Sequence, residues 1–258
     1  VLIGADPAEI VFTSGATESN NLAIKGVAEM YREKGNHIIT CMTEHKSVID
    51  TCKNLETKGY RITWLKPDKY GRVTAEQVED AITDATILIT IMVANNETCT
   101  LHPIAEIGKV AKKHEVIFHS DATQAVGKIP VNVETMGIDL LSISAHKMYG
   151  PKGVGGLYVR GHAPRVRLAI QMHGGGHEKG RRSGTLNVPG IVGLGAACKI
   201  AGDQMPVESE RIEKLRNRLQ ENILKGLDDV ALNGHPTERL PNTVNLGFAY
   251  VEGESIVL

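Results

Sequence analysis

The chain of 258 residues has almost no net charge, no long apolar run and few cysteines. Its 29 basic and 30 acidic side chains leave a formal charge of −1, so no bulk field attracts nucleic acid or an anionic membrane. No apolar run approaches the ~18 residues of a membrane span. No secretory signal opens the sequence, although we expect the natural chain to begin further upstream. We therefore expect neither nucleic-acid nor membrane binding.

Cysteine and histidine are too dispersed to predict a metal site or a disulfide framework. The spacing of the four cysteines contains no Cys-x-x-Cys pair. This usage indicates a reduced compartment, which we take to be the cytoplasm, or the mitochondrion in a eukaryote. Three glycines separate His173 from His177, which argues against a rigid pair of ligands. We predict no bound metal.

Short apolar runs alternate with amphipathic segments, a pattern typical of repeated βα units. Most of the apolar runs are continuous rather than alternating, as in a parallel sheet that helices cover on both faces. The sequence therefore predicts an α/β fold with a mostly parallel seven-stranded sheet. The predicted strands cover residues 9–13, 37–41, 61–65, 87–93, 116–120, 140–144 and 155–159.

Helices are predicted between these strands. Residues 17–34 repeat apolar side chains at helical spacing. Thr74 and Gln77 form a capping box, and Pro103 suits the first position of another helix. A further helix is predicted over residues 208–225, after the composition changes near Pro206. We predict a large domain over residues 1–203 without its N-terminal segment, and the truncated start of a smaller α+β domain over residues 204–258.

A lysine and an aspartate each follow a predicted strand. Lys147 lies on a polar turn after residues 140–144, and Asp121 follows residues 116–120. Pyridoxal 5'-phosphate requires such a pair, because an amine forms a Schiff base with its aldehyde while a carboxylate pairs with its ring nitrogen. The charged hydrogen bond to the ring nitrogen would contribute roughly 1.5–3 kcal/mol. Taken alone, an acid after a strand is more often a helix cap.

A phosphate site is predicted where residues 10–19 pass from strand through a glycine turn into a helix. A helix N-terminus offers free N–H groups and the positive end of a dipole, and Thr17 adds a hydroxyl. No Gly-Lys-Ser/Thr follows, which excludes a Walker loop. Ser144 and His146 could donate to the same phosphate. The alternative reading of the turn is an ordinary N-cap.

Three further polar residues also follow predicted strands. His45 could stack on the cofactor ring and move protons near neutral pH. Gln124 could reach the ring hydroxyl, and Asn96 could bind the cofactor or a substrate carboxylate. Each signal is weak alone, and His45 by itself reads as a plain loop histidine. All of them lie just past the carboxyl end of a strand, which is the edge where open α/β sheets bind ligands.

Taken together, six short motifs make the chain resemble the cysteine desulfurases, in which such motifs follow one another in the same order. These are pyridoxal-phosphate enzymes of the aspartate-aminotransferase fold (fold type I, class V aminotransferase group) that supply sulfur for iron–sulfur cluster assembly. The resemblance covers essentially the whole chain, and the combined signature is specific. The motifs are residues 13–20, 43–45, 95–97, 121–124, 144–147 and 182–185.

The resemblance implies a role for each site residue. Lys147 would carry the Schiff base and His45 would stack on the ring, both as catalytic residues. Thr185 would reach the phosphate of the partner subunit, which implies a homodimer. Asn96 would also lie at the substrate. The implied cofactor-binding residues are Ala16, Thr17, His45, Asn96, Asp121, Gln124, Ser144, Ala145, His146, Lys147 and Thr185.

The implied reaction converts L-cysteine to L-alanine and passes sulfur, as an enzyme persulfide, to iron–sulfur scaffold and sulfur-acceptor proteins. We expect the nucleophilic cysteine shortly after residue 255, and the arginine for the substrate carboxylate further on, both beyond residue 258. Cys99 stands where the family usually has glycine. We do not expect it to replace the nucleophile, because a reactive thiol needs access and a lowered pKa.

Other readings stay open. A selenocysteine lyase or a cysteine-sulfinate desulfinase would have the same fold and cofactor. A non-catalytic partner-binding protein could keep the fold after losing the nucleophile. A metal hydrolase that uses His119, Asp121, His173 and His177 is a weaker alternative.

Overall fold

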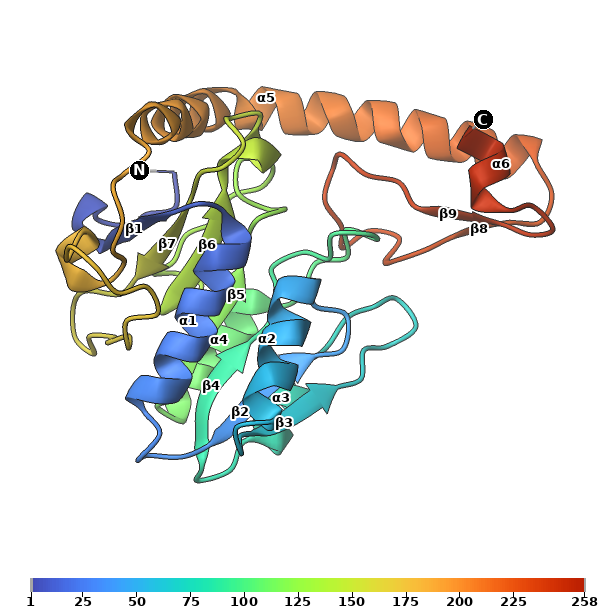
Figure 1. Ribbon diagram of the computed structural model, residues 1–258. Coiled ribbons are helices and arrows are strands. Elements are labelled where there is room, and N and C mark those ends of the chain that lie inside the picture. Colours follow the sequence, from blue (N-terminus) through green and yellow to red (C-terminus); the bar gives the residue numbers. More distant parts are fainter. Residues whose placement is uncertain (1, 258) are drawn as a thin grey trace.

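A seven-stranded sheet with helices on both faces forms the main body of the protein (Figure 1). The computed structural model describes residues 2–257. The strand order is β1-β7-β6-β5-β4-β2-β3, in which β2 to β6 are all parallel and β7 is antiparallel to both β6 and β1. The prediction of a mostly parallel sheet is confirmed. The strands are β1 Ile10–Thr13, β2 His37–Cys41, β3 Arg61–Leu65, β4 Thr86–Thr90, β5 Ile117–Asp121, β6 Leu140–Ser144 and β7 Gly155–Val159.

Four of the seven strands have the predicted bounds. β1 starts one residue later than predicted, and β5 is shifted by one residue. β4 ends at Thr90, three residues before the predicted end. The N–H groups of Ile91 and Val93 still donate to the carbonyls of His119 and Asp121 at 3.2 and 2.9 Å. The apolar run therefore continues along β5 after the regular strand has ended.

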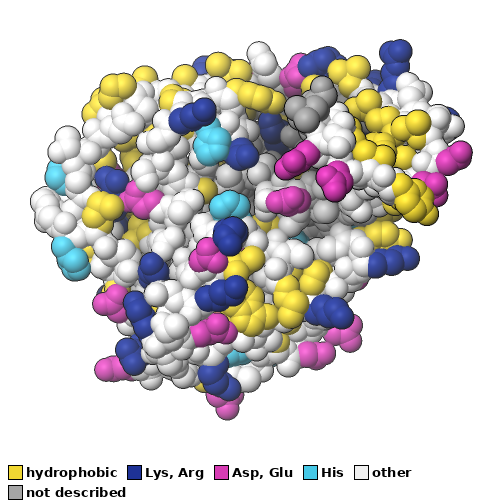
Figure 2. Space-filling view, turned by 45° about the vertical axis from the view of Figure 1, so that its right-hand side comes forward, with side chains coloured by type: hydrophobic (Ala, Val, Ile, Leu, Met, Phe, Trp, Pro, Cys, Tyr) yellow, Lys and Arg dark blue, Asp and Glu magenta, His cyan; other side chains and the backbone are white. Residues whose placement is uncertain are grey.

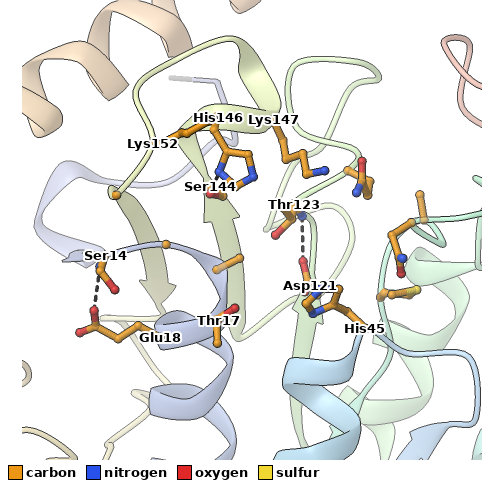
Figure 3. Close-up of a pocket in the computed structure, with 17 residues that line it drawn as sticks. Ser14, Thr17, Glu18, His45, Asp121, Thr123, Ser144, His146, Lys147 and Lys152 are labelled. Atoms are coloured by element: carbon orange, nitrogen blue, oxygen red, sulfur yellow. Dashed lines mark hydrogen bonds between the residues drawn. The ribbon is translucent and has the colours of Figure 1, made fainter.

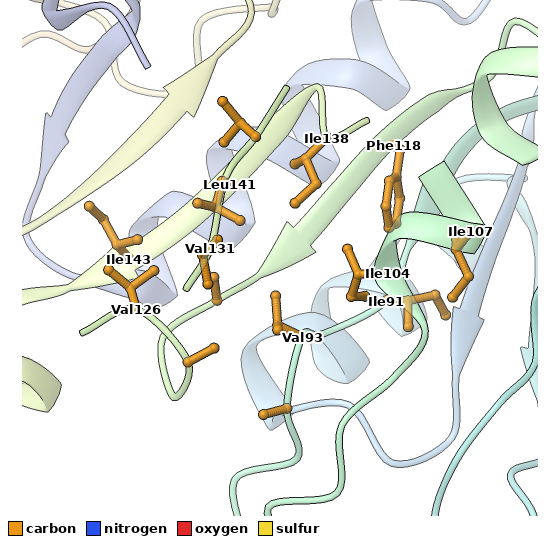
Figure 4. Close-up of a cluster of buried hydrophobic side chains, with 14 of the residues drawn as sticks. Ile91, Val93, Ile104, Ile107, Phe118, Val126, Val131, Ile138, Leu141 and Ile143 are labelled. Carbon is orange, nitrogen blue, oxygen red and sulfur yellow. The ribbon is translucent and has the colours of Figure 1, made fainter. Parts of the chain in front are cut away.

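The continuous apolar runs follow from burial on both faces of the sheet. Neighbouring residues of one strand point to opposite faces, so Leu140 packs in one hydrophobic cluster and Leu141 in the other. Helices α1 and α2 cover the first face, and α3 and α4 cover the second, where Ile107 and Phe118 are fully buried (Figure 4). These helices are α1 Ala16–Met30, α2 Lys46–Glu56, α3 Ala75–Ala81 and α4 Ile104–Lys113.

The predicted helix signals are found with small shifts. Thr74 Oγ1 accepts from the Gln77 N–H at 3.1 Å, and Gln77 Oε1 accepts from the Thr74 N–H at 2.9 Å, so the capping box is confirmed. Pro103 is the N-cap of α4 rather than its first helical residue. α1 ends at Met30, four residues before the predicted end.

The predicted start of the last long helix is wrong. Helix α5 spans Val188–Gly226 without interruption, and Pro206 lies inside it. Proline removes one helical hydrogen bond, but Pro206 is exposed, so water can satisfy the carbonyl that is left without a partner. The change of composition at residue 204 therefore falls within one helix. The division into domains 1–203 and 204–258 stays a prediction.

Beyond α5 the chain forms a small antiparallel pair of strands, β8 Val230–Leu232 and β9 Leu246–Phe248, followed by α6 Gly253–Val257 (Figure 1). Single 3₁₀ turns lie at Pro7–Glu9, Ala145–Met148 and Glu178–Gly180. Within residues 2–257 no helix is both long and apolar enough to cross a membrane. Basic and acidic side chains are interspersed over the face in Figure 2, in keeping with the low net charge.

Two helical glycines give opposite predictions for stability. A Cβ built on Gly108 of α4 would overlap with the carbonyl oxygen of Met136, whereas a Cβ on Gly195 of α5 meets nothing within 4 Å. We expect Gly108→Ala to destabilise the fold by roughly 1–3 kcal/mol. Gly195→Ala should stabilise it by about 0.5–1 kcal/mol, because alanine loses less backbone entropy in a helix.

Urea denaturation of both variants and of the parent chain measures the two effects. An unchanged midpoint for Gly108→Ala would mean that α4 does not pack against residues 136–137 as described.

Candidate active site

A cavity of about 500 Å³ opens at the carboxyl ends of the central parallel strands (Figure 3). β5 contributes Asp121 and β6 contributes Ser144, while the start of α1 closes the opposite wall. Because the ends of parallel strands meet at one edge of a sheet, residues far apart in sequence converge there. The cavity is lined by Ser14, Gly15, Ala16, Thr17, Glu18, His45, Met92, Ala94, Asn96, Asp121, Thr123, Gln124, Ser144, His146, Lys147, Lys152 and Gly153.

Nine of the eleven residues predicted for the site line this cavity. Ala145 does not: it is fully buried, and its backbone bonds to Val154 and Gly150. Thr185 does not line the cavity of the single chain either. The nine are Ala16, Thr17, His45, Asn96, Asp121, Gln124, Ser144, His146 and Lys147.

One end of the cavity is built to hold an anion. α1 begins there, after Gly15, whose φ of 151° and ψ of 179° lie in a region that only glycine adopts readily. The first N–H groups of a helix have no partner within the helix, so they are free to bind a ligand. Ser144 Oγ lies 2.8 Å from His146 Nδ1 on the facing wall. Burial and the charges of Lys147 and Lys152 all lower the pKa of His146.

Glu18, in the first turn of α1, would repel an anion if its charge were not compensated. It accepts from Arg182 Nε at 2.7 Å and from the Ser14 N–H at 2.7 Å. Burial acts to raise the pKa of Glu18, but the hydrogen bonds from Arg182 and Ser14 outweigh it and leave the pKa lowered. Arg182 therefore neutralises the charge beside the helix N-terminus.

The other end of the cavity presents a carboxylate. Asp121 is only 6% exposed, and it accepts from Asn20 Nδ2 at 2.7 Å and from the Thr123 N–H at 2.9 Å. Two donors fix the plane of the carboxyl group at the edge of the cavity; Figure 3 shows the bond from Thr123. Thr123 Oγ1 is buried in the wall and has no hydrogen-bond partner among residues 2–257. A buried hydroxyl in this position is suited to a ligand.

A layer of buried polar groups lies beneath Asp121. His119, two residues earlier on β5, contacts Thr90 Oγ1 at 2.8 Å and Ser142 Oγ at 3.0 Å. Burial lowers the pKa of His119 to about 4, although the charge of Asp121 acts in the opposite direction. Burial raises the pKa of Glu44 well above its ordinary value; the Met92 N–H opposes this shift and the charge of Asp121 adds to it.

Cys99 lacks both properties of a reactive thiol. It is 2% exposed, and burial raises its pKa, while a hydrogen bond with Thr243 and the charge of Arg239 act in the opposite direction. Its φ of 57° is left-handed, a conformation that glycine adopts without strain. This geometry explains why glycine would suit the position.

The described residues give no support to a metal site. No group of three His, Cys, Asp or Glu side chains in residues 2–257 is arranged to hold a metal ion. His119 lies in the core beneath the cavity, bonded to two hydroxyl groups. Residues 2–257 therefore contain no cluster of metal ligands of the kind that a metal hydrolase would need.

The sequence did not single out several residues that complete the site. Lys152 places a second amine in the cavity, and Thr123 and Glu18 line its wall. Asn20 and Glu44 lie behind the wall, inside motifs that were recognised for their neighbours. Both stand among polar neighbours in the sequence, so no local signal marked either of them.

The fold and this arrangement of groups define a class of protein. The family model described as "Aminotransferase class-V" matches residues 1–258, and the chain belongs to this family. The cysteine desulfurase IscS of Aeromonas hydrophila subsp. hydrophila is 57% identical over 257 residues, which are 100% of this chain and 63% of the relative.

Two solved structures are also similar. A NifS-like protein superposes with a TM-score of 0.94 at 40% identity, covering 99% of this chain and 69% of that one. A structure titled "SspA in complex with cysteine" superposes with a TM-score of 0.84 at 44% identity, covering 98% and 69%. The chain spans 63%, a little under two thirds, of the length of the IscS desulfurase of Aeromonas hydrophila subsp. hydrophila.

Enzymes of this family depend on pyridoxal 5'-phosphate, and the cavity fits it. The start of α1, with Ser144 and His146, suits the phosphate, and Lys147 suits the aldehyde. Asp121 suits the ring nitrogen, because two hydrogen bonds hold its carboxyl group at the cavity edge and its remaining lone pairs can accept another N–H. Thr123, whose hydroxyl has no hydrogen-bond partner among residues 2–257, also lies in the wall of this cavity.

The buried Glu44 predicts an unusual pH dependence of stability. Its pKa is raised in the folded state, so folding favours the protonated form, and stability present below pH 4.5 is lost as the pH rises through the raised pKa. In Glu44→Gln this loss should disappear, because the amide keeps an acceptor for the Met92 N–H at 2.7 Å and never ionises.

Urea denaturation of the cofactor-free protein between pH 5 and 8 measures this dependence. Glu79→Gln is the control, because hydrogen bonds from His114 and Lys113 lower the pKa of that exposed carboxyl group. Parallel pH curves for the parent chain and Glu44→Gln would contradict the prediction.

Proposed function

We propose that the full-length protein is a pyridoxal-phosphate-dependent cysteine desulfurase. It would convert L-cysteine to L-alanine and pass the sulfur, as an enzyme persulfide, into iron–sulfur cluster assembly. The observation that carries this proposal is the convergence of Lys147, Asp121 and His45 on one cavity beside the N-terminus of α1. The identity of 57% to an IscS desulfurase along the whole chain supports it.

The bound cofactor would supply an electron sink for the bonds around the substrate α-carbon. Lys147 Nζ would hold the cofactor and, once released, accept and return a proton. Asp121 would keep the ring nitrogen protonated, since both its oxygens are held in place by the Asn20 amide and the Thr123 N–H. His45, the N-cap residue of α2, would lie against the ring.

The remaining side chains would fix the orientation of the cofactor and the substrate. The backbone of Ala16 and Thr17 would bind the phosphate together with Ser144 and His146. Gln124 would contact the ring hydroxyl and Asn96 the substrate. Ala145 would contribute only its backbone, because its side chain points into the core.

The dimer, the sulfur acceptor and the location are part of the same proposal. Thr185 would complete the phosphate site of a second subunit, which makes the active form a homodimer. The sulfur-accepting thiol would be a mobile cysteine after residue 255, since Cys41, Cys52 and Cys99 are buried and the half-buried Cys198 does not line the cavity. Scaffold and acceptor proteins would take the sulfur from it, in the cytoplasm or, in a eukaryote, the mitochondrion.

The test uses the full-length protein with cysteine, selenocysteine and cysteine sulfinate as substrates. We expect alanine release from cysteine and a visible absorbance band after addition of the cofactor. Lys147→Ala should abolish both, with a loss of at least three orders of magnitude in rate, because no other group forms the covalent bond. Lys112→Ala, on the exposed face of α4, is the matched control.

Turnover of selenocysteine alone, or of cysteine sulfinate alone, would replace the proposal with a lyase or a desulfinase of the same fold. A band without turnover of any of the three substrates would indicate a non-catalytic protein.

A further inference from the structure

A chain of hydrogen bonds joins Asp121 to His45 behind the cavity wall. Asn20, on α1, is completely buried, and its Nδ2 donates to Asp121 Oδ2 at 2.7 Å and to Ser47 Oγ at 2.8 Å. Ser47 Oγ in turn lies 2.8 Å from His45 Nδ1. The chain thus connects β5, α1 and the first turn of α2, and its two ends lie close together in the cavity (Figure 3).

The chemistry of the groups fixes the direction of each bond. Asn20 must present its NH₂ group to Asp121, because its carbonyl oxygen would repel a carboxylate oxygen at that distance. The same NH₂ group can only donate to Ser47 Oγ, which keeps its hydroxyl hydrogen and one lone pair for His45 Nδ1. The backbone N–H of Ser47 also donates to His45 Nδ1, at 3.1 Å. This backbone bond decides between the two, because it requires a lone pair on Nδ1, and the hydroxyl of Ser47 must then donate.

His45 Nδ1 therefore accepts two hydrogen bonds and has no room for a proton. The neutral ring then carries its proton on Nε2. Nε2 has no hydrogen-bond partner among residues 2–257, and His45 lines the cavity. The ring consequently offers an N–H to the cavity, while its lone pair faces α2.

The buried amide of Asn20 supports this reading independently. Its Oδ1 is buried and has no partner among the described residues. An unpaired buried acceptor destabilises a fold. A residue that served packing alone would not leave one, so the two donor hydrogens of Asn20 are what this position requires.

We propose that Asn20 and Ser47 are positioning residues that hold His45 in the neutral form protonated on Nε2. His45 then acts toward the bound cofactor or substrate as a hydrogen-bond donor, and Nε2 cannot accept a proton in this state. The role of His45 toward the cofactor or substrate rests on the proposed function, whereas the assignment of its tautomer does not. The alternative, a base with its lone pair on Nε2, would require Nδ1–H to face the Ser47 N–H.

Nitrogen NMR of cofactor-free, full-length protein with ¹⁵N-labelled histidine tests the tautomer directly. The signals of His45 are assigned by their loss in His45→Gln. We expect Nδ1 to resonate as an unprotonated ring nitrogen and Nε2 as a protonated one. In Ser47→Ala the ratio of the two tautomers should shift toward Nδ1–H by roughly five-fold, the ratio that corresponds to one ordinary hydrogen bond.

Three further variants separate positioning from a general structural effect. Ser47→Thr keeps the hydroxyl and should restore the parent signals. Asn20→Ala should shift the ratio in the same direction as Ser47→Ala, while Asn21→Ala, whose amide donates to the Thr17 carbonyl at 2.9 Å, should not. Ser47 is half-buried, so Ser47→Ala decides the matter if Asn20→Ala fails to fold.

A proton on Nδ1 in the parent protein, or unchanged His45 signals in Ser47→Ala, would overturn the proposal. These signals need no turnover, so they remain informative if the protein proves inactive on cysteine. In that event the proposed function fails and the tautomer assignment stands. In an active enzyme, Ser47→Ala should lower kcat several-fold with little effect on KM for cysteine, and Ser47→Thr should recover it.

Discussion

The carboxylate of Asp121 is the group on which the rest of the site depends. It lies at the end of β5, the central strand of the sheet, where it is only 6% exposed and a charged group needs hydrogen-bond donors. Asn20 from α1 and the N–H of Thr123 supply them. This requirement ties the helix that forms the anion end of the cavity to the strand that forms its opposite end.

The polar layer beneath Asp121 lowers the stability of the fold, because it buries ionisable groups next to the site. His119 and Glu44 are both buried, and both have pKa values shifted toward their neutral forms. Burial is the largest cause of both shifts. Natural proteins commonly accept such a loss of stability at a functional site.

Much of the fold could be predicted from local pattern. Buried parallel strands read as continuous apolar runs, and four of the seven have the predicted bounds. α5 was the largest error, because the sequence reads Pro206 as a break, whereas its exposure lets the helix continue. The nine cavity residues that were predicted lie at or after the end of a strand, and strand ends meet at one edge.

Asn20, Ser47 and Glu44 could not be predicted, because their partners lie on other elements. Asn20 reads as one polar residue in an amphipathic helix, and only the packing of α1 against α2 and β5 brings it to Ser47 and Asp121. The role proposed for Thr185 rests on the family resemblance alone, because its expected contact lies in another subunit. The local sequence predicts which residues end a strand, but it does not predict which helix packs over that end.

The covalent attachment of the cofactor is the most direct test of this account. Full-length protein is incubated with pyridoxal 5'-phosphate, reduced with borohydride and digested, and the modified peptide is located by mass spectrometry. The account predicts the phosphopyridoxyl group on Lys147. A group on Lys152, the other amine in the cavity, or no modification at all, would contradict it.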